Sequence, residues 1–217
     1  MRFRDRRQAG HALGERFRLL RADDPVVVGI ARGGVVVARE IADVLGAPLD
    51  VLLIGKIEVP GRPGTELAAV GEGGVLVTNY DAAARLGMAP AELRFAANRE
   101  RAELARRIKP LRQHIRRVPV GGRTVILTDD AVTTGATARA AIRVLRARGA
   151  HRVVLAVPFA PVAALDQLSR DADQIVCLRQ QPTAVTARGV HGEFPPLTDE
   201  DALASLAPAP APELIPA

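Results

Sequence analysis

Hydrophobic residues along the chain follow two patterns, short continuous runs and longer segments in which they recur every three or four positions. The continuous runs predict buried strands and lie at residues 26–30, 49–54, 123–127, 152–157 and 174–178. Helical spacing predicts helices between several of these runs, at residues 37–45, 135–148 and 162–169. Because strands and helices alternate, we expect an α/β fold, a mostly parallel sheet with helices on both faces.

Further helices are expected outside this alternation. Residues 9–21 predict an N-terminal helix, and Pro90 suits the first turn of a long one. Pro110 should kink or end that long helix, because proline removes a backbone donor and clashes with the preceding turn. A last helix is expected at residues 198–206, with Thr198 as its N-cap.

Residues 57–79 interrupt the pattern, because they hold five glycines and two prolines. They predict a long loop with a short strand at residues 75–77, and such a loop in a compact domain is usually a lid or a disordered segment. The length of 217 residues suits one domain, which we place at residues 1–206. Residues 207–217 are rich in proline and alanine and predict a disordered tail.

Charge and cysteine content restrict the possible partners and compartment. The net charge of +6 comes mainly from arginines in residues 2–21 and 94–117, and it would attract an anionic small substrate or nucleic acid. Aromatic residues, at 3%, are too few for the base stacking of single-strand binders. The single cysteine, Cys177, excludes an internal disulfide. No hydrophobic run suits a secretory signal or a membrane span, so we expect a cytoplasmic protein.

The segment with the clearest chemical pattern is residues 124–137, where a hydrophobic strand ends in two acids and a Thr/Gly loop leads into a helix. Ligands in open parallel sheets bind at the carboxyl ends of strands, where this loop would lie. The candidate binding residues are Asp129, Asp130, Ala131, Val132, Thr133, Thr134, Gly135, Ala136 and Thr137.

Each part of this segment suits a phosphorylated ribose. A helix N-terminus favours an anion, and Gly135 lets the backbone approach a phosphate closely. The hydroxyls of Thr133, Thr134 and Thr137 can donate further hydrogen bonds to the phosphate. Asp129 and Asp130 cannot bind phosphate, but they can accept hydrogen bonds from the two free hydroxyls of the sugar.

Other functions for an acidic pair at a strand end remain less favoured. Phosphate-accepting regulators and metal-dependent phosphatases need further acids or a lysine at other strand ends, and no acid follows the strands that end at Ile30 and Val157. A Walker-type loop needs a Gly-Lys-Ser/Thr sequence, which is absent. A purely structural turn would not need two carboxylates and three threonines around one glycine.

The segment resembles the 5-phosphoribosyl-1-pyrophosphate (PRPP) motif of the type I phosphoribosyltransferases. The matching parts are the strand at 125–128, the pair Asp129 and Asp130, and the loop at 134–137. Ala131 departs from the pattern, because many members have glycine there. Residues 3–10 resemble a branch of predicted phosphoribosyltransferases whose substrate is not settled.

The resemblance implies roles for other segments. Ala31, Arg32, Gly33 and Gly34 match the loop that binds pyrophosphate, although such a sequence also suits a tight turn with a solvated arginine. Lys56 matches a basic residue before the flexible loop, but could be a surface lysine. Residues 57–79 match the mobile lid, with a floppy surface loop as the alternative. Residues 180–206 would form a C-terminal hood that selects the base.

The implied activity is Mg²⁺-dependent transfer of the ribose 5-phosphate group of PRPP to a nitrogenous base, with release of pyrophosphate. Asp129, Asp130, Arg32 and Lys56 are the catalytic candidates, and Mg²⁺ would be held mainly by PRPP and water, with no direct protein ligand. A homodimer is expected from the family. The alternatives are a PRPP- or nucleotide-sensing regulator, with nucleic-acid binding through residues 94–117, and a ribose-phosphate hydrolase. Nucleic acid is the less favoured partner, because Glu100 and Glu103 interrupt the positive charge.

Overall fold

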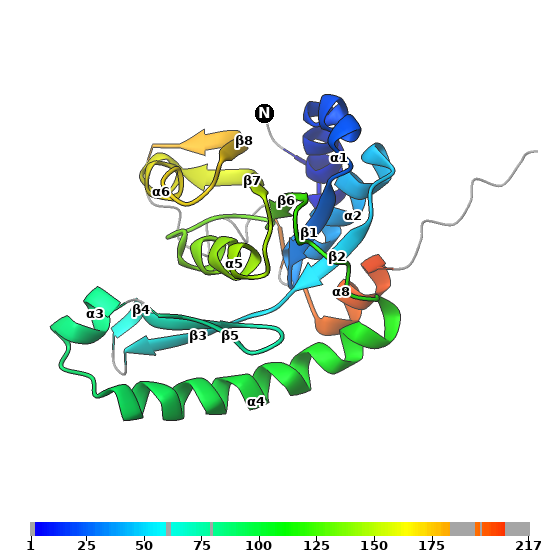
Figure 1. Cartoon of the computed structure of the whole chain (residues 1–217). Coiled ribbons are helices and arrows are strands. Elements are labelled where there is room, and N and C mark those ends of the chain that lie inside the picture. The colour runs from blue at the N-terminus through cyan, green and yellow to red at the C-terminus, as the bar shows by residue number, and fades with distance from the viewer. Residues whose placement is uncertain (1–2, 60–61, 79, 183–193, 196, 207–217) are drawn as a thin grey trace, which may run out of the picture.

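The centre of the molecule is a five-stranded, entirely parallel sheet with the strand order β2-β1-β6-β7-β8 (Figure 1). A computed structural model describes residues 3–59, 62–78, 80–182, 194–195 and 197–206. The strands of this sheet are β1 (Val26–Ile30), β2 (Leu49–Leu52), β6 (Thr124–Thr128), β7 (Arg152–Pro161) and β8 (Gln174–Gln181). Each predicted strand is present, and the predicted fold class is confirmed.

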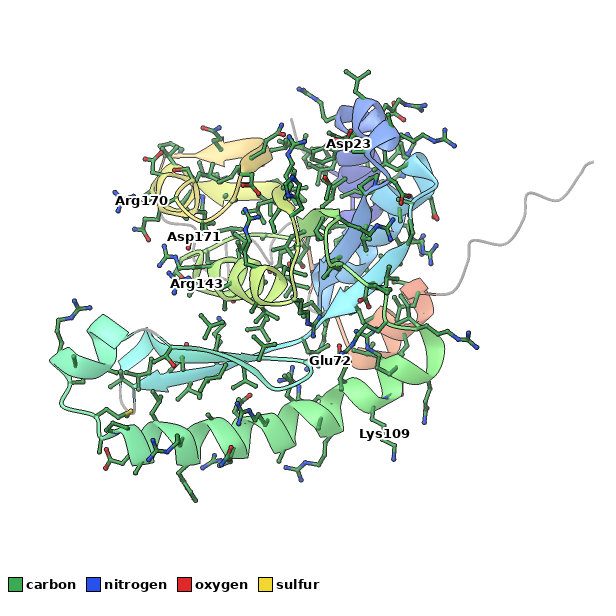
Figure 2. All side chains as sticks on the ribbon, in the orientation of Figure 1. Asp23, Glu72, Lys109, Arg143, Arg170 and Asp171 are labelled. Atoms are coloured by element: carbon green, nitrogen blue, oxygen red, sulfur yellow. The ribbon has the colours of Figure 1, made fainter. Side chains whose placement is uncertain are left out.

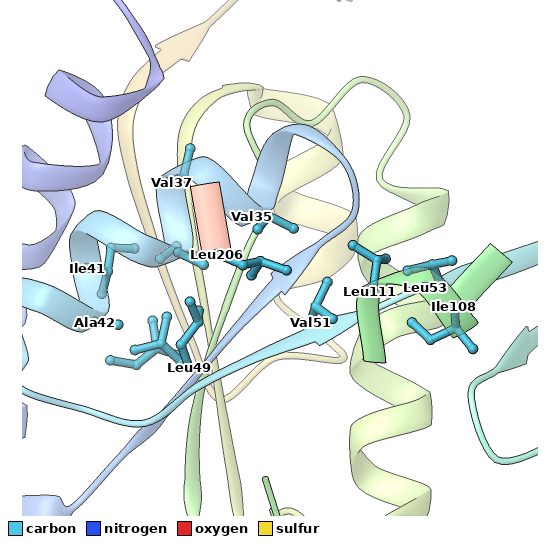
Figure 3. Close-up of a cluster of buried hydrophobic side chains, with 14 of the residues drawn as sticks. Val35, Val37, Ile41, Ala42, Leu49, Val51, Leu53, Ile108, Leu111 and Leu206 are labelled. Carbon is cyan, nitrogen blue, oxygen red and sulfur yellow. The ribbon is translucent and has the colours of Figure 1, made fainter. Parts of the chain in front are cut away.

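Helices cover both faces of this sheet, because successive strand residues point to opposite sides. On one face, Ile126 packs in a cluster with residues of α2 (Gly33–Leu45), part of which is shown in Figure 3. On the other face, Val125 and Leu127 pack with α5 (Ala136–Ala147) and α6 (Val162–Leu168). The central strands β1 and β6 are therefore fully buried, as the continuous runs in the sequence predict, while the edge strand β8 is only half-buried.

The prediction of a loop at residues 57–79 is wrong. The chain there forms an antiparallel sheet of β3 (Ile54–Val59), β4 (Arg62–Gly71) and β5 (Val75–Thr78), followed by α3 (Tyr80–Arg85). Together with the long helix α4 (Pro90–His114), these elements make an arm that extends from the central sheet (Figure 1). The short strand expected at residues 75–77 corresponds to β5.

The arm is held to the central sheet by a buried cluster of charged side chains. Arg112 of α4 donates hydrogen bonds to Asp50 Oδ1 (2.6 Å) and to Glu72 Oε1 (2.8 Å), and both acids are almost fully buried. Arg117 forms a further ion pair with Glu72 at 2.7 Å. Glu72 lies in the turn between β4 and β5, where the arm meets the central sheet (Figure 2). The cluster thereby links β2, the hairpin turn and the end of α4.

Two helices differ from their predicted extents. The N-terminal helix α1 spans Arg6–Arg16 and a 3₁₀ helix, η1, spans Arg18–Asp23, in place of one helix at residues 9–21. Asp5 sets the earlier start, because its side chain accepts a hydrogen bond from the backbone N–H of Gln8 (2.8 Å) as an N-cap. The long helix does not end at Pro110 but continues for four more residues, to His114.

Near the C-terminus, α8 (Asp199–Leu206) packs on α2, and Thr198 caps it as predicted. Thr198 Oγ1 accepts a hydrogen bond from the backbone N–H of Asp201 (3.1 Å), and Asp201 Oδ2 accepts one from the backbone N–H of Thr198 (2.9 Å). The rest of the predicted hood, residues 183–193, and the predicted tail, residues 207–217, lie outside the described residues.

Thr198→Ala is expected to lower the free energy of unfolding by about 1 kcal/mol, because the helix loses its capping acceptor. Urea denaturation measures this change. Thr198→Ser is the matched control, since it keeps the hydroxyl, and it should stay within about 0.5 kcal/mol of the wild type. Equal destabilisation by both variants would contradict the capping role.

Candidate active site

The strand order reverses between β1 and β6, at the centre of the parallel sheet. The strand after β1 lies on one side of this pair and the strand after β6 lies on the other, while α2 and α5 cover opposite faces. Gly29 of β1 is level with Thr128 of β6, so both strands end at the same edge. A crevice at such a switch point is the usual ligand site of a parallel α/β sheet. The loops at residues 31–34 and 129–137 both begin there.

These two loops are in direct contact, although about 100 positions separate them in the sequence. A Cβ atom on Gly33 would lie 1.9 Å from Asp130 Oδ2, and one on Gly34 would lie 2.7 Å from the carbonyl oxygen of Thr128. Neither position can hold a side chain without displacing the acidic segment. The peptide bond between Ala31 and Arg32 is cis. The structure therefore brings the Gly-containing loop and both acids together.

The two acids have different surroundings. Asp130 forms an ion pair with Arg6 of α1, whose Nε and Nη2 atoms lie 2.8 and 2.7 Å from Asp130 Oδ2. Asp129 Oδ1 accepts a hydrogen bond from the backbone N–H of Asp130 (2.8 Å). Burial and the neighbouring charge of Asp130 raise the pKa of Asp129 well above its usual value, although the charge of Lys56 acts in the opposite direction. The crevice thus holds one ion-paired acid and one acid whose ionised form is disfavoured.

Asp129→Asn is expected to raise the melting temperature above neutral pH. An acid whose pKa is raised by folding stabilises the native state at low pH, and this stabilisation is lost as the pH rises through the raised pKa. Asparagine stays neutral at every pH, so Asp129→Asn does not lose stability in this way as the pH rises. We expect an increase of about 2–4 °C at pH 8, the size of a 1 kcal/mol effect in a chain of this length. Thermal unfolding at pH 5 and pH 8 measures it, and a lower melting temperature at pH 8 would contradict it.

The Thr/Gly loop lies at the N-terminus of α5. Gly135 is the N-cap residue with φ of 81°, a left-handed conformation that favours glycine, and a Cβ atom there would lie 3.2 Å from Leu168. Thr133 and Thr134 are exposed, and Thr137 is half-buried. Together with Asp129, these residues line a small pocket of about 30 Å³. The pocket places hydroxyls and helix N–H groups beside one carboxylate, an arrangement suited to a phosphate next to a sugar.

Arg32 and Lys56 border the same region. Arg32 is exposed, and its Nη1 donates a hydrogen bond to the carbonyl oxygen of Leu197 (3.1 Å). Lys56 lies within β3, opposite Ala69, and not before a flexible loop as the resemblance implies. Its charge nevertheless acts on Asp129. Within the described residues, no group of three or more His, Cys, Asp and Glu side chains could hold a metal ion.

Two residues near the acids were not predicted as part of the site. Arg6 is 7% exposed, and its guanidinium lies 5.0 Å from the centre of the Phe194 ring. Phe194 packs in turn against Phe159, with ring centres 5.2 Å apart. The arginine-rich start of the sequence and the resemblance carried by residues 3–10 both include Arg6, but neither distinguishes it from its neighbours.

A family model of the phosphoribosyl transferase domain matches residues 6–190. The chain belongs to the phosphoribosyl transferase family. Among the relatives of this chain is a protein of Mycobacterium tuberculosis, present in strains CDC 1551 and H37Rv, that carries the provisional name of a phosphoribosyl transferase. It is 38% identical over 204 residues, which are 94% of this chain and 46% of the relative. The chain therefore spans about half the length of the curated relatives it matches.

Solved structures agree with the family assignment at the level of the fold. The protein TT1426 from Thermus thermophilus is 42% identical, with a TM-score of 0.83 over 95% of this chain and 98% of that one. A hypothetical protein from Neisseria gonorrhoeae with bound ppGpp is 14% identical, with a TM-score of 0.50 over 95% and 93% of the two chains, and it shares the fold alone. Among the described residues of this chain, no helix has the length and hydrophobicity needed to cross a bilayer.

Proposed function

We propose that the protein transfers the ribose 5-phosphate group of PRPP to a nitrogenous base and releases pyrophosphate. The observation that carries this proposal is the contact between the Gly33–Gly34 turn and the acids Asp129 and Asp130 at the switch point of the sheet. Binding sites for the two ends of PRPP would thereby share one crevice. Family membership supports a transferase, and the names of the relatives specify no substrate.

In this mechanism the protein works by positioning and by electrostatics, without a covalent nucleophile. The hydroxyls of the Thr/Gly loop and the N-terminus of α5 would bind the 5-phosphate, and Asp129 and Asp130 would orient the ribose hydroxyls. Arg32, the amides that follow it and Lys56 would stabilise the charge that develops on the leaving pyrophosphate. The hairpin of β3 and β4 would act as the cover that excludes water from the reacting carbon.

The carboxylate oxygens in the crevice fit a magnesium ion that is bound mostly through the substrate. Mg²⁺ prefers oxygen ligands, keeps several waters and is usually held by one or two carboxylates plus substrate phosphates. Asp129 and Asp130 are the carboxylates in reach of the crevice, and one oxygen of Asp130 is already committed to Arg6. Bound there, Mg²⁺ would neutralise part of the pyrophosphate charge.

Calorimetry with PRPP, with and without Mg²⁺, tests this proposal. We expect the wild type to bind and Asp129→Asn/Asp130→Asn to lose binding, because the ribose hydroxyls then lack charged acceptors. A screen of nucleobases for pyrophosphate release would follow. No binding by a folded wild type with Mg²⁺ and the bases present would contradict the proposal. Phosphate release without a base would indicate a hydrolase instead.

A regulatory protein that senses PRPP or a nucleotide is the second candidate. The outer surface of α4 favours it, because that surface carries exposed basic side chains, namely Arg94, Arg99, Arg106, Arg107 and Lys109. PRPP binding without base-dependent pyrophosphate release, together with salt-sensitive binding of nucleic acid, would support this candidate. The main proposal includes a cytoplasmic homodimer, and sedimentation equilibrium tests the dimer.

A further inference from the structure

Arg6 connects three parts of the chain at the acidic pair. It lies in the first turn of α1. Its Nε and Nη2 both contact Asp130, which is 124 positions away in the sequence. Its Nη2 also donates a weaker hydrogen bond to the carbonyl oxygen of Phe194 (3.4 Å), and its guanidinium stacks on the Phe194 ring. With 7% of its side chain exposed, Arg6 is one of the few buried charged residues among those described.

Only one of the two carboxylate oxygens of Asp130 takes part in this ion pair. Arg6 Nε and Nη2 both bind Oδ2, at 2.8 and 2.7 Å. Gly33 lies nearer to the same oxygen, because a Cβ atom there would lie 1.9 Å from Oδ2 and 2.9 Å from Oδ1. Neither of the two contacts of Arg6 in this ion pair involves Oδ1. The carboxylate is therefore held by Arg6 through one oxygen, and the other oxygen takes no part in the ion pair.

We propose that Arg6 is the positioning residue of the ribose site, which holds Asp130 through Oδ2 so that Oδ1 accepts a hydrogen bond from a hydroxyl of the bound ribose. This inference rests on the proposed function and adds a residue that the sequence motif does not contain. Arg6 itself touches no substrate in this arrangement. It acts by keeping the acceptor correctly oriented, which a charge-assisted contact does better than a neutral side chain.

The competing explanation is that the Arg6–Asp130 pair only fastens α1 to the sheet. The ratio of the affinity for ribose 5-phosphate to the affinity for an analogue that lacks one hydroxyl separates these explanations. A loss of folded protein lowers both apparent affinities equally and leaves their ratio unchanged. The three probes are ribose 5-phosphate and its two analogues, one without the 2-hydroxyl and one without the 3-hydroxyl, and each ratio compares ribose 5-phosphate with one analogue. The proposal requires that Arg6 affects the preference for the hydroxylated sugar, not only the amount of active protein.

The experiment measures these affinities by calorimetry for the wild type, Arg6→Gln, Arg6→Lys and Arg7→Gln. Arg7 is the matched control, because it is adjacent in α1 and also fastens that helix, through an ion pair with Glu40 of α2 at 3.0 Å. We expect the wild type and Arg7→Gln to prefer ribose 5-phosphate to one of the analogues by about tenfold or more, as for a hydrogen bond to a charged group. Arg6→Gln should bring that ratio close to one, and Arg6→Lys should restore part of it.

A ratio that stays at the wild-type value in Arg6→Gln, whatever its melting temperature, overturns the inference. If Arg6→Gln does not fold, Arg6→Lys decides the matter, since an unchanged ratio in that variant also overturns it. Failure of the proposed function gives a different result, because the folded wild type would then bind neither PRPP nor ribose 5-phosphate. Wild-type binding with no effect of Arg6 defeats the inference alone.

Discussion

Gly34→Ala is expected to lower the free energy of unfolding by about 1–3 kcal/mol, the usual cost of an extra methyl group in a packed interior. The added Cβ atom would lie 2.7 Å from the carbonyl oxygen of Thr128 and 2.9 Å from the Cα atom of Asp129. Both are backbone atoms, so no side-chain rotation relieves the contact. The turn or the end of β6 must move, and the two halves of the crevice separate. We therefore also expect PRPP affinity to fall by more than tenfold.

Gly33→Ala should give a different pattern. Its Cβ atom would collide with the side chain of Asp130, which can rotate away at the expense of the ion pair with Arg6. PRPP affinity should fall more than stability does. Gly121→Ala is the control for both variants, because its Cβ atom would meet only the carbonyl oxygen of Arg148, at 3.7 Å. Urea denaturation measures the free energy of unfolding, and calorimetry measures PRPP affinity. Equal values for all three variants would contradict the close contact between the two glycines and the acidic segment.

Arg112→Met should destabilise the protein by about 3–5 kcal/mol, because it removes the cation that two buried acids share. Asp50 is 2% exposed and Glu72 is 8% exposed, and neither can be solvated without opening the junction of arm and sheet. Arg106→Met is the control. Arg106 pairs with Glu103 on the solvent face of the same helix, with a side chain 77% exposed, and its loss should cost no more than about 1 kcal/mol. Urea denaturation compares the two, and equal losses would contradict the role of burial.

The pH dependence of the stability of Arg112→Met is a second test of this charged cluster. Burial alone would raise the pKa of Glu72, but hydrogen bonds from Arg112 and Arg117 outweigh it, and the pKa lies below its ordinary value of 4.5. Glu72 therefore stabilises the wild type above that value, and this contribution is lost as the pH falls through the lowered pKa. In the variant, burial disfavours the charged form. The deficit relative to the wild type should be larger at pH 7 than at pH 4.

The sequence was sufficient for the central sheet because local and tertiary preferences agree there. A fully buried parallel strand needs a continuous hydrophobic run, and each run became a strand. The predicted helices α2, α5 and α6 likewise place their hydrophobic residues on the sheet. The acid pair and the Thr/Gly loop were found for a similar reason, since a strand end and a helix start determine where they lie. Their binding roles stay predictions.

The arm was missed because its glycines were taken as signs of a loose chain. One of them, Gly71, is instead a site of close packing in a strand, because a Cβ atom there would lie 2.4 Å from Val144 of α5. Gly55, just before the segment, packs in the same way, with a Cβ atom 2.4 Å from Glu100 of α4. The small antiparallel sheet passes between these two helices, which come 45 and 73 positions later. A local reading of composition cannot include such partners.

Arg6 was missed for a related reason. Its neighbours Arg4 and Arg7 are exposed, and only Arg6 is directed inward, because the N-cap at Asp5 sets the rotation of α1. Its partner is the acid that follows β6, and its second contact is close to the C-terminal helix. No spacing rule connects residues that far apart.

The distance along the chain between Arg6 and Phe194, 188 positions, affects how the protein acquires its site during synthesis. A ribosome adding roughly 5–20 residues per second needs about 10–40 s to cover that interval. Throughout it, the first helix of the nascent chain holds a cation whose aromatic neighbour does not yet exist. The contact between Arg6 and Phe194 beside the crevice is therefore completed only after residue 194 has been synthesised.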